Sequence, residues 1–227
     1  MNDTSQLALG ATALGLAGTW VWRQRPALRT LHRGSALALA LFLVAHVLGH
    51  LAGLAGVAAH QGVLEVLRSV YRQPVVEGVL LAGVLFQAGS GLALLWRGWR
   101  QCRGAVAWAQ AVSGGYLSLF LLIHVTAVLV ARLYGVDTNL QFAAAGMHRP
   151  PWQWFFGPYY FLAVLALCTH VGCALYWNLS PRLRAPVLAA ALVVGVLLAA
   201  TLVVMLAGVP PVQGADGWLS GGALPPQ

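Results

Sequence analysis

Five long apolar stretches dominate this sequence and limit what it can fold into. They cover residues 35–57, 75–96, 106–131, 155–177 and 185–207, and crossing the hydrocarbon core of a bilayer takes roughly 20 apolar residues of helix. Only 8% of the residues are charged and 59% are hydrophobic, which leaves too little polar surface for a water-soluble domain. The sequence therefore predicts an all-α fold, an integral membrane helix bundle with five transmembrane helices.

The chain ends differ in character from this bundle. An earlier apolar stretch, residues 7–22, is short and rich in Gly and Thr, so it is either a sixth span or an interfacial helix. We divide the chain into an N-terminal segment (1–34), a transmembrane bundle (35–208) and a Gly/Pro-rich tail (209–227). Because the first Arg residues follow the apolar stretch instead of preceding it, we expect no cleaved signal peptide.

The net charge of +8 comes from Arg residues in short clusters between the apolar stretches. Such clusters are typical of topology control, and they argue against a nucleic-acid partner. Nine of the arginines are predicted to lie on one side of the membrane: Arg23, Arg25, Arg29, Arg33, Arg97, Arg100, Arg103, Arg182 and Arg184. The positive-inside rule predicts that this face is cytoplasmic, in a membrane such as the bacterial inner membrane, and that the tail lies outside.

Histidines inside the predicted spans are the strongest functional signal. An ionisable group in hydrocarbon is costly, so it usually lines a binding site or an ion pathway. Four histidines lie within spans: His46 and His50 in the first, His124 in the third and His170 in the fourth. The other three lie in connections, where we expect them to be solvated: His32, His60 and His148.

Depth in the membrane sorts these histidines into two levels. At about 1.5 Å per residue, His124 lies toward the outer end of the third span, near the level of His46 and His50. His170 lies in the inner half, where the nearest residue of the second span is Gln87. The spacing therefore predicts an outer His/His pair and an inner His/Gln pair.

Two neutral imidazoles from facing helices are a usual way to hold a low-spin haem b in a bundle. The three cysteines form no CxxCH motif, so we expect no covalent haem attachment. These patterns predict haem b at the outer pair. An alternative remains open, above all for His170 and Gln87: each side chain only hydrogen-bonds to a neighbouring helix.

Five short strings give the sequence a family resemblance. RTLHRG precedes the first span, FLVAHVLGH lies within it and VVEGVLLAGVLFQAGSG lies in the second, while AQAVSGGYLSLFLLIHV and YYFLAVLALCTHVG lie in the third and fourth. In this order, over residues 29–178, they resemble the five-helix, single-polypeptide cytochrome b anchor of succinate:quinone oxidoreductases. These are succinate dehydrogenases and fumarate reductases of the dihaem type.

The resemblance implies a set of haem ligands. In that family the first and third spans ligate an outer haem, and the second and fourth ligate a haem nearer the iron–sulphur subunit. Carried over, His46 and His124 are expected to bind the outer haem iron and His170 to be one ligand of the inner haem. Gln87 stands where the family has a histidine. An amide is a poor ligand to haem iron beside imidazole, so a second haem lacks an expected ligand.

The partner of His124 is open between two residues one helical turn apart. Counting depth favours His50, whereas the string match favours His46. We follow the match, because helix tilt shifts a depth by about one turn.

Glu77, at the edge of the second span and close to Arg72, is the candidate for handling the proton of quinone chemistry. Partial burial beside an outer haem would suit a carboxyl group to that task. The alternative is a carboxylate that only stabilises the start of its helix.

The resemblance implies a membrane anchor that passes electrons between an iron–sulphur subunit and a quinone, embedded in membrane lipid. The chain has no dinucleotide fingerprint and no cysteine cluster, so flavin and iron–sulphur clusters are expected on partner subunits, a flavoprotein and an iron–sulphur protein. The alternatives are a stand-alone membrane cytochrome b and a haem-free transporter or scaffold.

Overall fold

Within residues 25–210, five helices are long and apolar enough to cross a membrane. The structure, a computed structural model, describes residues 25–210, which contain helices and no strand. The five long helices are α2 (Arg25–Leu51), α4 (Pro74–Gly98), α5 (Ala105–Leu133), α7 (Gln153–Asn178) and α8 (Pro181–Gly208). The predicted all-α bundle with five membrane-spanning helices is confirmed. The stretch 7–22 lies outside the described residues.

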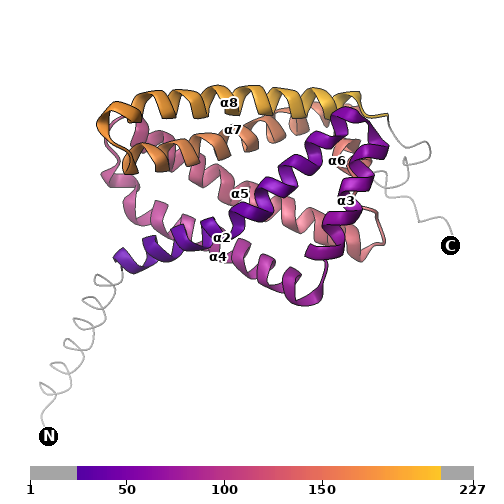
Figure 1. Ribbon diagram of the computed structural model, residues 1–227, viewed down its shortest axis with the longest axis horizontal. Coiled ribbons are helices and arrows are strands. Elements are labelled where there is room, and N and C mark those ends of the chain that lie inside the picture. The colour runs from indigo at the N-terminus through magenta and orange to yellow at the C-terminus, as the bar shows by residue number, and fades with distance from the viewer. Residues whose placement is uncertain (1–24, 211–227) are drawn as a thin grey trace, which may run out of the picture.

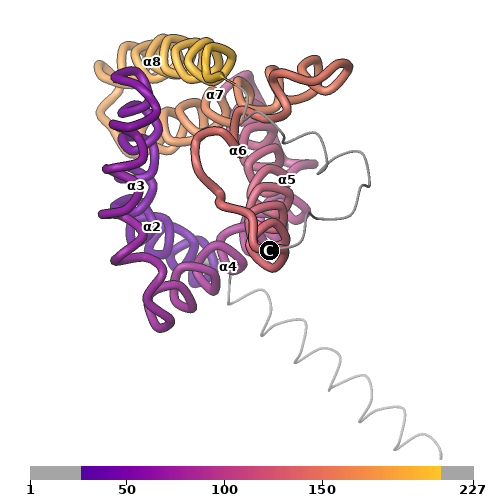
Figure 2. The backbone as a smooth tube through the Cα atoms, turned by 90° about the vertical axis from the view of Figure 1, so that its right-hand side faces the viewer, coloured from indigo at the N-terminus to yellow at the C-terminus, as the bar shows by residue number. Residues whose placement is uncertain are grey.

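The long helices pack mainly on their neighbours in sequence. α2 packs on α4, α4 on α5, α5 on α7 and α7 on α8. Figure 1 shows α7 and α8 side by side along one edge of the bundle, with α2 crossing in front of α5. Viewed from one end, the helices surround a central region, with α7 and α8 on one side of it and α4 on the opposite side (Figure 2).

The first long helix does not match its predicted limits. α2 begins at Arg25 and ends at Leu51, whereas the apolar stretch covers residues 35–57. Hydropathy marks where a chain meets lipid, but a helix continues into a less apolar segment whose residues, such as Arg, Leu and Ala, have good helix propensity. After Leu51 the chain continues as a short 3-10 helix over Ala52–Ala55, which stops at Gly56. Gly56 has φ of 109°, a conformation that other residues rarely adopt.

Two short helices between the spans were not predicted. α3 (Val57–Tyr71) follows α2 through η1 (Ala52–Ala55), and α6 (Leu140–Ala144) precedes η3 (Ala145–His148). A further short helix, η2 (Trp99–Gln101), extends α4. Figure 1 shows α3 crossing one end of the bundle, in the manner of an interfacial helix.

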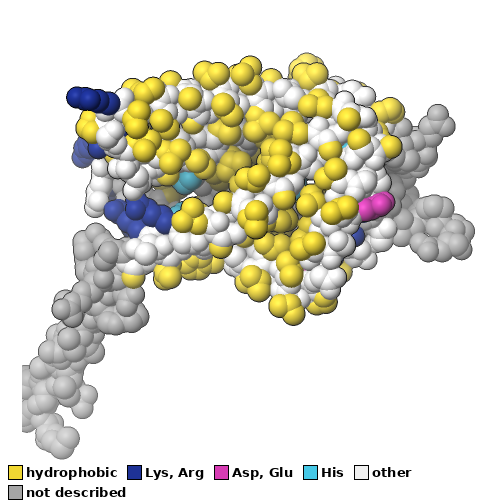
Figure 3. All heavy atoms as spheres, viewed as in Figure 1, with side chains coloured by type: hydrophobic (Ala, Val, Ile, Leu, Met, Phe, Trp, Pro, Cys, Tyr) yellow, Lys and Arg dark blue, Asp and Glu magenta, His cyan; other side chains and the backbone are white. Residues whose placement is uncertain are grey.

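The charged residues divide between the two ends of the bundle. At the end where α2 begins lies a cluster of arginines, which we call the Arg-rich end: Arg29, Arg33, Arg97, Arg100, Arg103, Arg182 and Arg184. The opposite end, which we call the mixed-charge end, carries α3 and both signs of charge: Arg68, Arg72, Arg132, Arg149, Glu65, Glu77 and Asp137. Figure 3 shows arginine side chains gathered at one end, and acidic side chains with an arginine nearby at the other. The predicted charge asymmetry is therefore present.

Small residues let α7 and α8 approach closely. A Cβ atom added at Gly172 would lie 2.7 Å from the Cβ atom of Ala191, and one at Gly195 would lie 2.8 Å from that of Cys168. In a membrane, helix association depends on such van der Waals contact. At the mixed-charge end, the buried side chains of Leu140, Leu202 and others continue this contact between α6 and α8.

This packing predicts opposite effects for two Gly→Ala substitutions. We expect Gly172→Ala to destabilise the protein by about 1–3 kcal/mol, because the new methyl group overlaps Ala191 and neither can move away. Gly78→Ala in α4 meets no atom within 4 Å and should instead stabilise the helix by about 0.5–1 kcal/mol. Thermal unfolding in detergent measures both. Equal midpoints for the two variants would contradict the close α7–α8 contact.

Candidate functional site

Four histidines from three helices gather near the mixed-charge end. The ring centres of His46 and His50 are 4.7 Å apart, those of His46 and His124 are 6.1 Å apart, and those of His50 and His60 are 5.6 Å apart. We call this set the histidine cluster. It joins α2, α3 and α5.

Helix geometry explains how two of these rings reach the same place. His46 and His50 are one turn apart on α2, so both face the interior of the bundle. His124 lies on α5, in the half that leads to the mixed-charge end. The structure thus brings together the three residues that sequence spacing placed at one depth, and His46 contacts the ring of His124.

Aromatic rings hold the two facing imidazoles. Phe42 stacks on His46 at 5.6 Å, and Phe120 stacks on His124 at 5.1 Å. Phe120 also contacts Tyr159 of α7, which links the cluster to the far side of the bundle. Each of the two imidazoles therefore packs on an aromatic ring, and the two imidazoles meet edge to face.

His60 is the residue of this cluster that the sequence analysis missed. We expected it to be solvated, but its side chain is only 3% exposed and its Nδ1 atom is buried without a hydrogen-bond partner. The reason is α3: Val57, His60, Leu64 and Leu67 recur at helical spacing and form its inward face. That periodicity was the signal available in the sequence.

A second polar region lies toward the Arg-rich end, around His170 of α7. Its Nδ1 atom lies 3.2 Å from the backbone carbonyl oxygen of Gln110 and 3.4 Å from the Oγ atom of Ser113, both on α5. A Cβ atom at Gly114 would lie 2.9 Å from the Cε1 atom of His170. The ring therefore rests on the α5 backbone where glycine leaves room.

Gln87 bonds to α2. Its amide NH₂ donates to the Nε2 atom of His32 at 3.1 Å, and the hydroxyl of Ser35 donates to its Oε1 atom at 2.6 Å. The Nδ1 atom of His32 lies 2.8 Å from the Oγ atom of Ser90. We expected His32 to be solvated in a connection, and this was wrong, because α2 begins early enough to include it.

The candidates Glu77 and Arg72 at the mixed-charge end both have partners within the protein. The guanidinium group of Arg132 donates to both carboxylate oxygens of Glu77, in the first turn of α4. Arg72 donates to the hydroxyl of Thr138 at 3.2 Å, and Arg68 pairs with Asp137 at 2.6 Å. These contacts tie α3 to the segment after α5. They give Glu77 and Arg72 a structural role beside any role in proton transfer.

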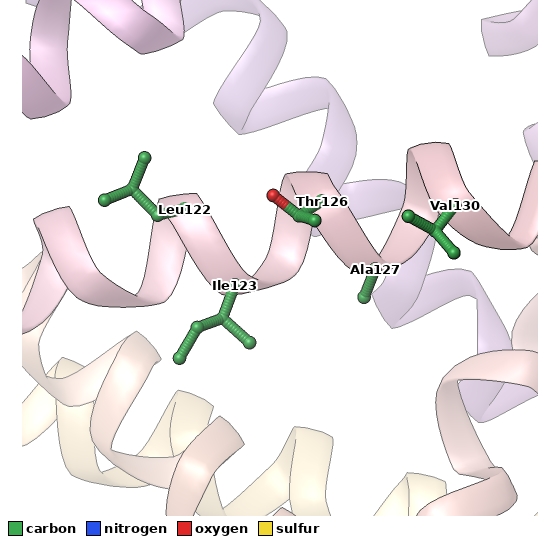
Figure 4. Close-up of a pocket in the computed structure, with 5 residues that line it drawn as sticks. All are labelled: Leu122, Ile123, Thr126, Ala127 and Val130. Carbon is green, nitrogen blue, oxygen red and sulfur yellow. The ribbon is translucent and has the colours of Figure 1, made fainter.

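One shallow groove lies on the lipid-facing side of α5. Figure 4 shows five side chains that line it, all from a single helix: Leu122, Ile123, Thr126, Ala127 and Val130. They are almost entirely apolar, and they point away from the histidine cluster. The groove is therefore part of the surface that meets lipid.

The donor chemistry of the histidine cluster fits the haem that the sequence suggests. A haem takes two axial ligands from the protein. An iron atom between two imidazoles keeps the ring centres roughly 6 Å apart, since each metal–nitrogen bond is about 2 Å and each ring centre lies about 1 Å behind its nitrogen. His46 and His124 have this separation. Within residues 25–210, no group of three or more His, Cys, Asp and Glu side chains is arranged to hold a metal ion.

Comparison with known proteins adds no relative to this picture. No protein-family model, curated protein or solved structure matches the chain.

The burial of His60 predicts a pH effect on stability. Burial lowers the pKa of His60, and the positive charge of Arg68 lowers it further. Below about pH 6.5 an exposed histidine binds a proton, so the unfolded chain is protonated at His60 while the folded chain still resists protonation. The contribution of neutral His60 to the free energy of unfolding is therefore fully present above about pH 6.5, and it is lost as the pH falls toward the pKa of the folded state.

We expect the midpoint temperature of unfolding to be lower at pH 5 than at pH 8. The difference should be smaller in His60→Leu. Thermal unfolding of both proteins at the two pH values is the measurement. If the two proteins lose the same amount, the buried imidazole of His60 is not a source of acid sensitivity.

Proposed function

We propose that this protein is a haem b-containing membrane anchor. In this proposal it passes electrons between the iron–sulphur subunit of a succinate dehydrogenase or fumarate reductase and a membrane quinone. The observation that carries the haem is the facing pair of imidazoles, His46 and His124, brought from α2 and α5 to a ring separation of 6.1 Å. The partner enzyme is proposed from the ordered strings over residues 29–178.

The chain's own residues have defined parts in this proposal. His46 and His124 would hold the haem, and Phe42 and Phe120 stack on the two imidazoles. The haem supplies reversible one-electron transfer when bound. The helices around it exclude water, and the polar side chains at the mixed-charge end would pass on the two protons that a quinone takes up with two electrons when it is reduced to a quinol.

His50 is the alternative to His46 as a ligand. Its ring centre is 4.7 Å from that of His46, at an interplanar angle of 90°, and it also contacts His60. In our proposal, His46 binds iron because its ring contacts that of His124. His50 then links the iron site to His60 beneath α3.

Charge distribution supports docking of soluble subunits at the Arg-rich end. None of the described carboxylates lies there, whereas the mixed-charge end pairs Arg68 with Asp137 and Arg132 with Glu77. An acidic protein surface would therefore be attracted to the Arg-rich end. By the positive-inside rule this end faces the cytoplasm, so the membrane is proposed to be a bacterial inner membrane. Quinone would then react near Glu77 and Arg72, at the other end.

Haem content tests the proposal. We expect the protein, purified from cells with ample haem, to show a Soret band and a pyridine haemochrome of b type, removable by acidic organic solvent. His46→Ala and His124→Ala should each abolish the low-spin haem spectrum, because each variant lacks one of the two imidazoles that would hold the haem. His50→Ala, the matched control one turn away, should keep it.

Each other outcome has a clear meaning. If the folded protein shows no Soret band, the cytochrome proposal is wrong. A haem-free transporter or scaffold, in which the buried histidines serve proton transfer or packing, would then be the better explanation. Loss of haem in His50→Ala but not in His46→Ala would assign His50 as the ligand. Haem without any co-purifying flavoprotein or iron–sulphur subunit would favour a stand-alone cytochrome b.

Orientation is a separate prediction. We expect the connection around Arg100 to be cytoplasmic, because arginine clusters are retained on that side. In a variant whose three native cysteines are replaced by serine, a single cysteine beside Arg100 in intact cells should be protected from an impermeant thiol reagent. One placed in the mixed-charge end, at Asn139, should be labelled. The reverse pattern would move the proposed docking face to the other end.

A further inference from the structure

Helix α3 lies across the mixed-charge end of the bundle. Figure 2, which looks onto this end, shows α3 crossing in front of α2. The two helices are in contact, since a Cβ atom added at Gly49 of α2 would lie 3.1 Å from the Cδ1 atom of Leu67 and 3.8 Å from the Cγ1 atom of Val63. The ring centres of His60 and His50 are 5.6 Å apart. α3 therefore closes the histidine cluster at this end.

The chain turns at both ends of α3. Before it, Gly56 has φ of 109°, a conformation that suits glycine and is costly for other residues. A Cβ atom at Gly56 would meet no atom of the described residues within 4 Å. After α3, Arg72 and Gln73 precede Pro74, which starts α4. α3 is thus a separate segment between two short joints, and rotation about such joints needs no change within α2 or α4.

Two side-chain contacts hold the last turns of α3 to the segment that follows α5. The guanidinium group of Arg68 donates to the carboxylate of Asp137 at 2.6 Å. That of Arg72 donates to the hydroxyl of Thr138 at 3.2 Å. We call these two contacts the latch. The carboxylate of Asp137 is half exposed, and an ion pair with an exposed partner is weak and is screened by salt.

The observed position of α3 has an unfavourable contribution at His60. This side chain is 3% exposed, and its Nδ1 atom has no hydrogen-bond partner among residues 25–210. A buried polar atom without a partner forgoes the hydrogen bond that it would make to water. Movement of α3 away from the cluster would restore that bond and break the latch. Contributions of opposite sign at one short helix are what a segment with two positions requires.

The outward face of α3 suits a helix that moves at the membrane surface. Val66 and Val70, one turn apart, are 69% and 61% exposed. An amphipathic helix with such a face lies in the interfacial layer of a bilayer. The lipid surface therefore accepts these side chains both when α3 lies on the bundle and when it lies beside it.

We propose that α3 is a lid over the histidine cluster, held shut by the latch and hinged at Gly56 and Gln73. In the closed position, His60 covers His50, and the cluster is shielded from the mixed-charge end. In the open position, both imidazoles are exposed, and a small molecule reaches the cluster from that end. The lid requires no bound cofactor, so it goes beyond the proposed function.

Chemical modification of histidine tests the lid in the full-length protein in detergent. Diethyl pyrocarbonate acylates neutral imidazoles that it can reach, and mass spectrometry gives the rate at each histidine. We expect Asp137→Asn to raise the rate at His60 by about 2- to 5-fold, the effect of losing an exposed ion pair. Glu65→Gln is the matched control. It removes a charge from α3 that bonds only to Gln61 of the same helix among the printed contacts of the latch region, and it should keep the wild-type rate.

Salt and a cross-link give two independent checks. At 1 M salt, charges are screened beyond about 3 Å, so salt should raise the rate at His60 in the wild-type protein and have little effect in Asp137→Asn. In a background without the three native cysteines, a disulfide between Gly49→Cys and Val63→Cys should fix α3 on α2. The Cβ atom at position 49 would lie 3.8 Å from the Cγ1 atom of Val63, a place that a cysteine sulphur can take, and this separation is close to disulfide geometry. The oxidised variant should react several-fold more slowly at His60, and reduction should restore the rate.

His170 on α7 distinguishes a lid from a loosened bundle, because it contacts α5 and not α3. Its rate should be the same in every variant. An equal rise at His60 and His170 would mean that the whole bundle opens, and would overturn the lid. Equal rates at His60 in the wild-type protein, Asp137→Asn and the oxidised cross-linked variant would overturn it as well. These rates do not depend on haem, so failure of the lid leaves the proposed function untouched, and a protein without haem still tests the lid.

Discussion

Hydrocarbon offers no hydrogen-bond partner to a polar group, and this constraint shapes the whole bundle. Helices satisfy their own backbone groups, but polar side chains must find partners within the protein. The hydroxyl of Tyr116 donates to the backbone of Tyr159 at 2.9 Å, and that of Tyr160 donates to the backbone of Ala143 at 3.0 Å. Each such bond fixes how two segments lie against each other. Polar residues therefore set the register of the helices in this bundle, and small residues set how closely the helices approach each other.

The same constraint explains why sequence predicted the fold better than the site. Five apolar stretches specify five helices, because lipid permits no other way to cross with these residues. Hydropathy does not reveal which connecting residues fold back onto the bundle. From the sequence we expected His60 in a loop. The turn at Gly56 instead starts α3, and His60 lies buried on the inward face of that helix. A search for helical periodicity in that short segment was the missing step.

Gln87 shows a second limit of the sequence analysis. Comparison with the family's strings treats one residue at a time, so it indicated only that Gln87 stands where the resemblance implies a histidine. It did not reveal that the amide of Gln87 would bond to His32, on a helix 55 residues away in sequence. That contact depends on α2 starting at Arg25 and on Ser35 and Ser90 flanking the same polar spot. Only the packing of α2 on α4 brings these residues together.

The histidines at the two ends of the bundle are held by different kinds of interaction, and the difference has a physical consequence. Aromatic rings stack on His46 and His124, through Phe42 and Phe120, whereas hydrogen bonds to protein oxygens hold His32 and His170. A hydrogen bond to a backbone carbonyl oxygen, as at His170, fixes which ring nitrogen carries the hydrogen, because that oxygen only accepts. Stacking on an apolar ring fixes the position of an imidazole but leaves its tautomer open.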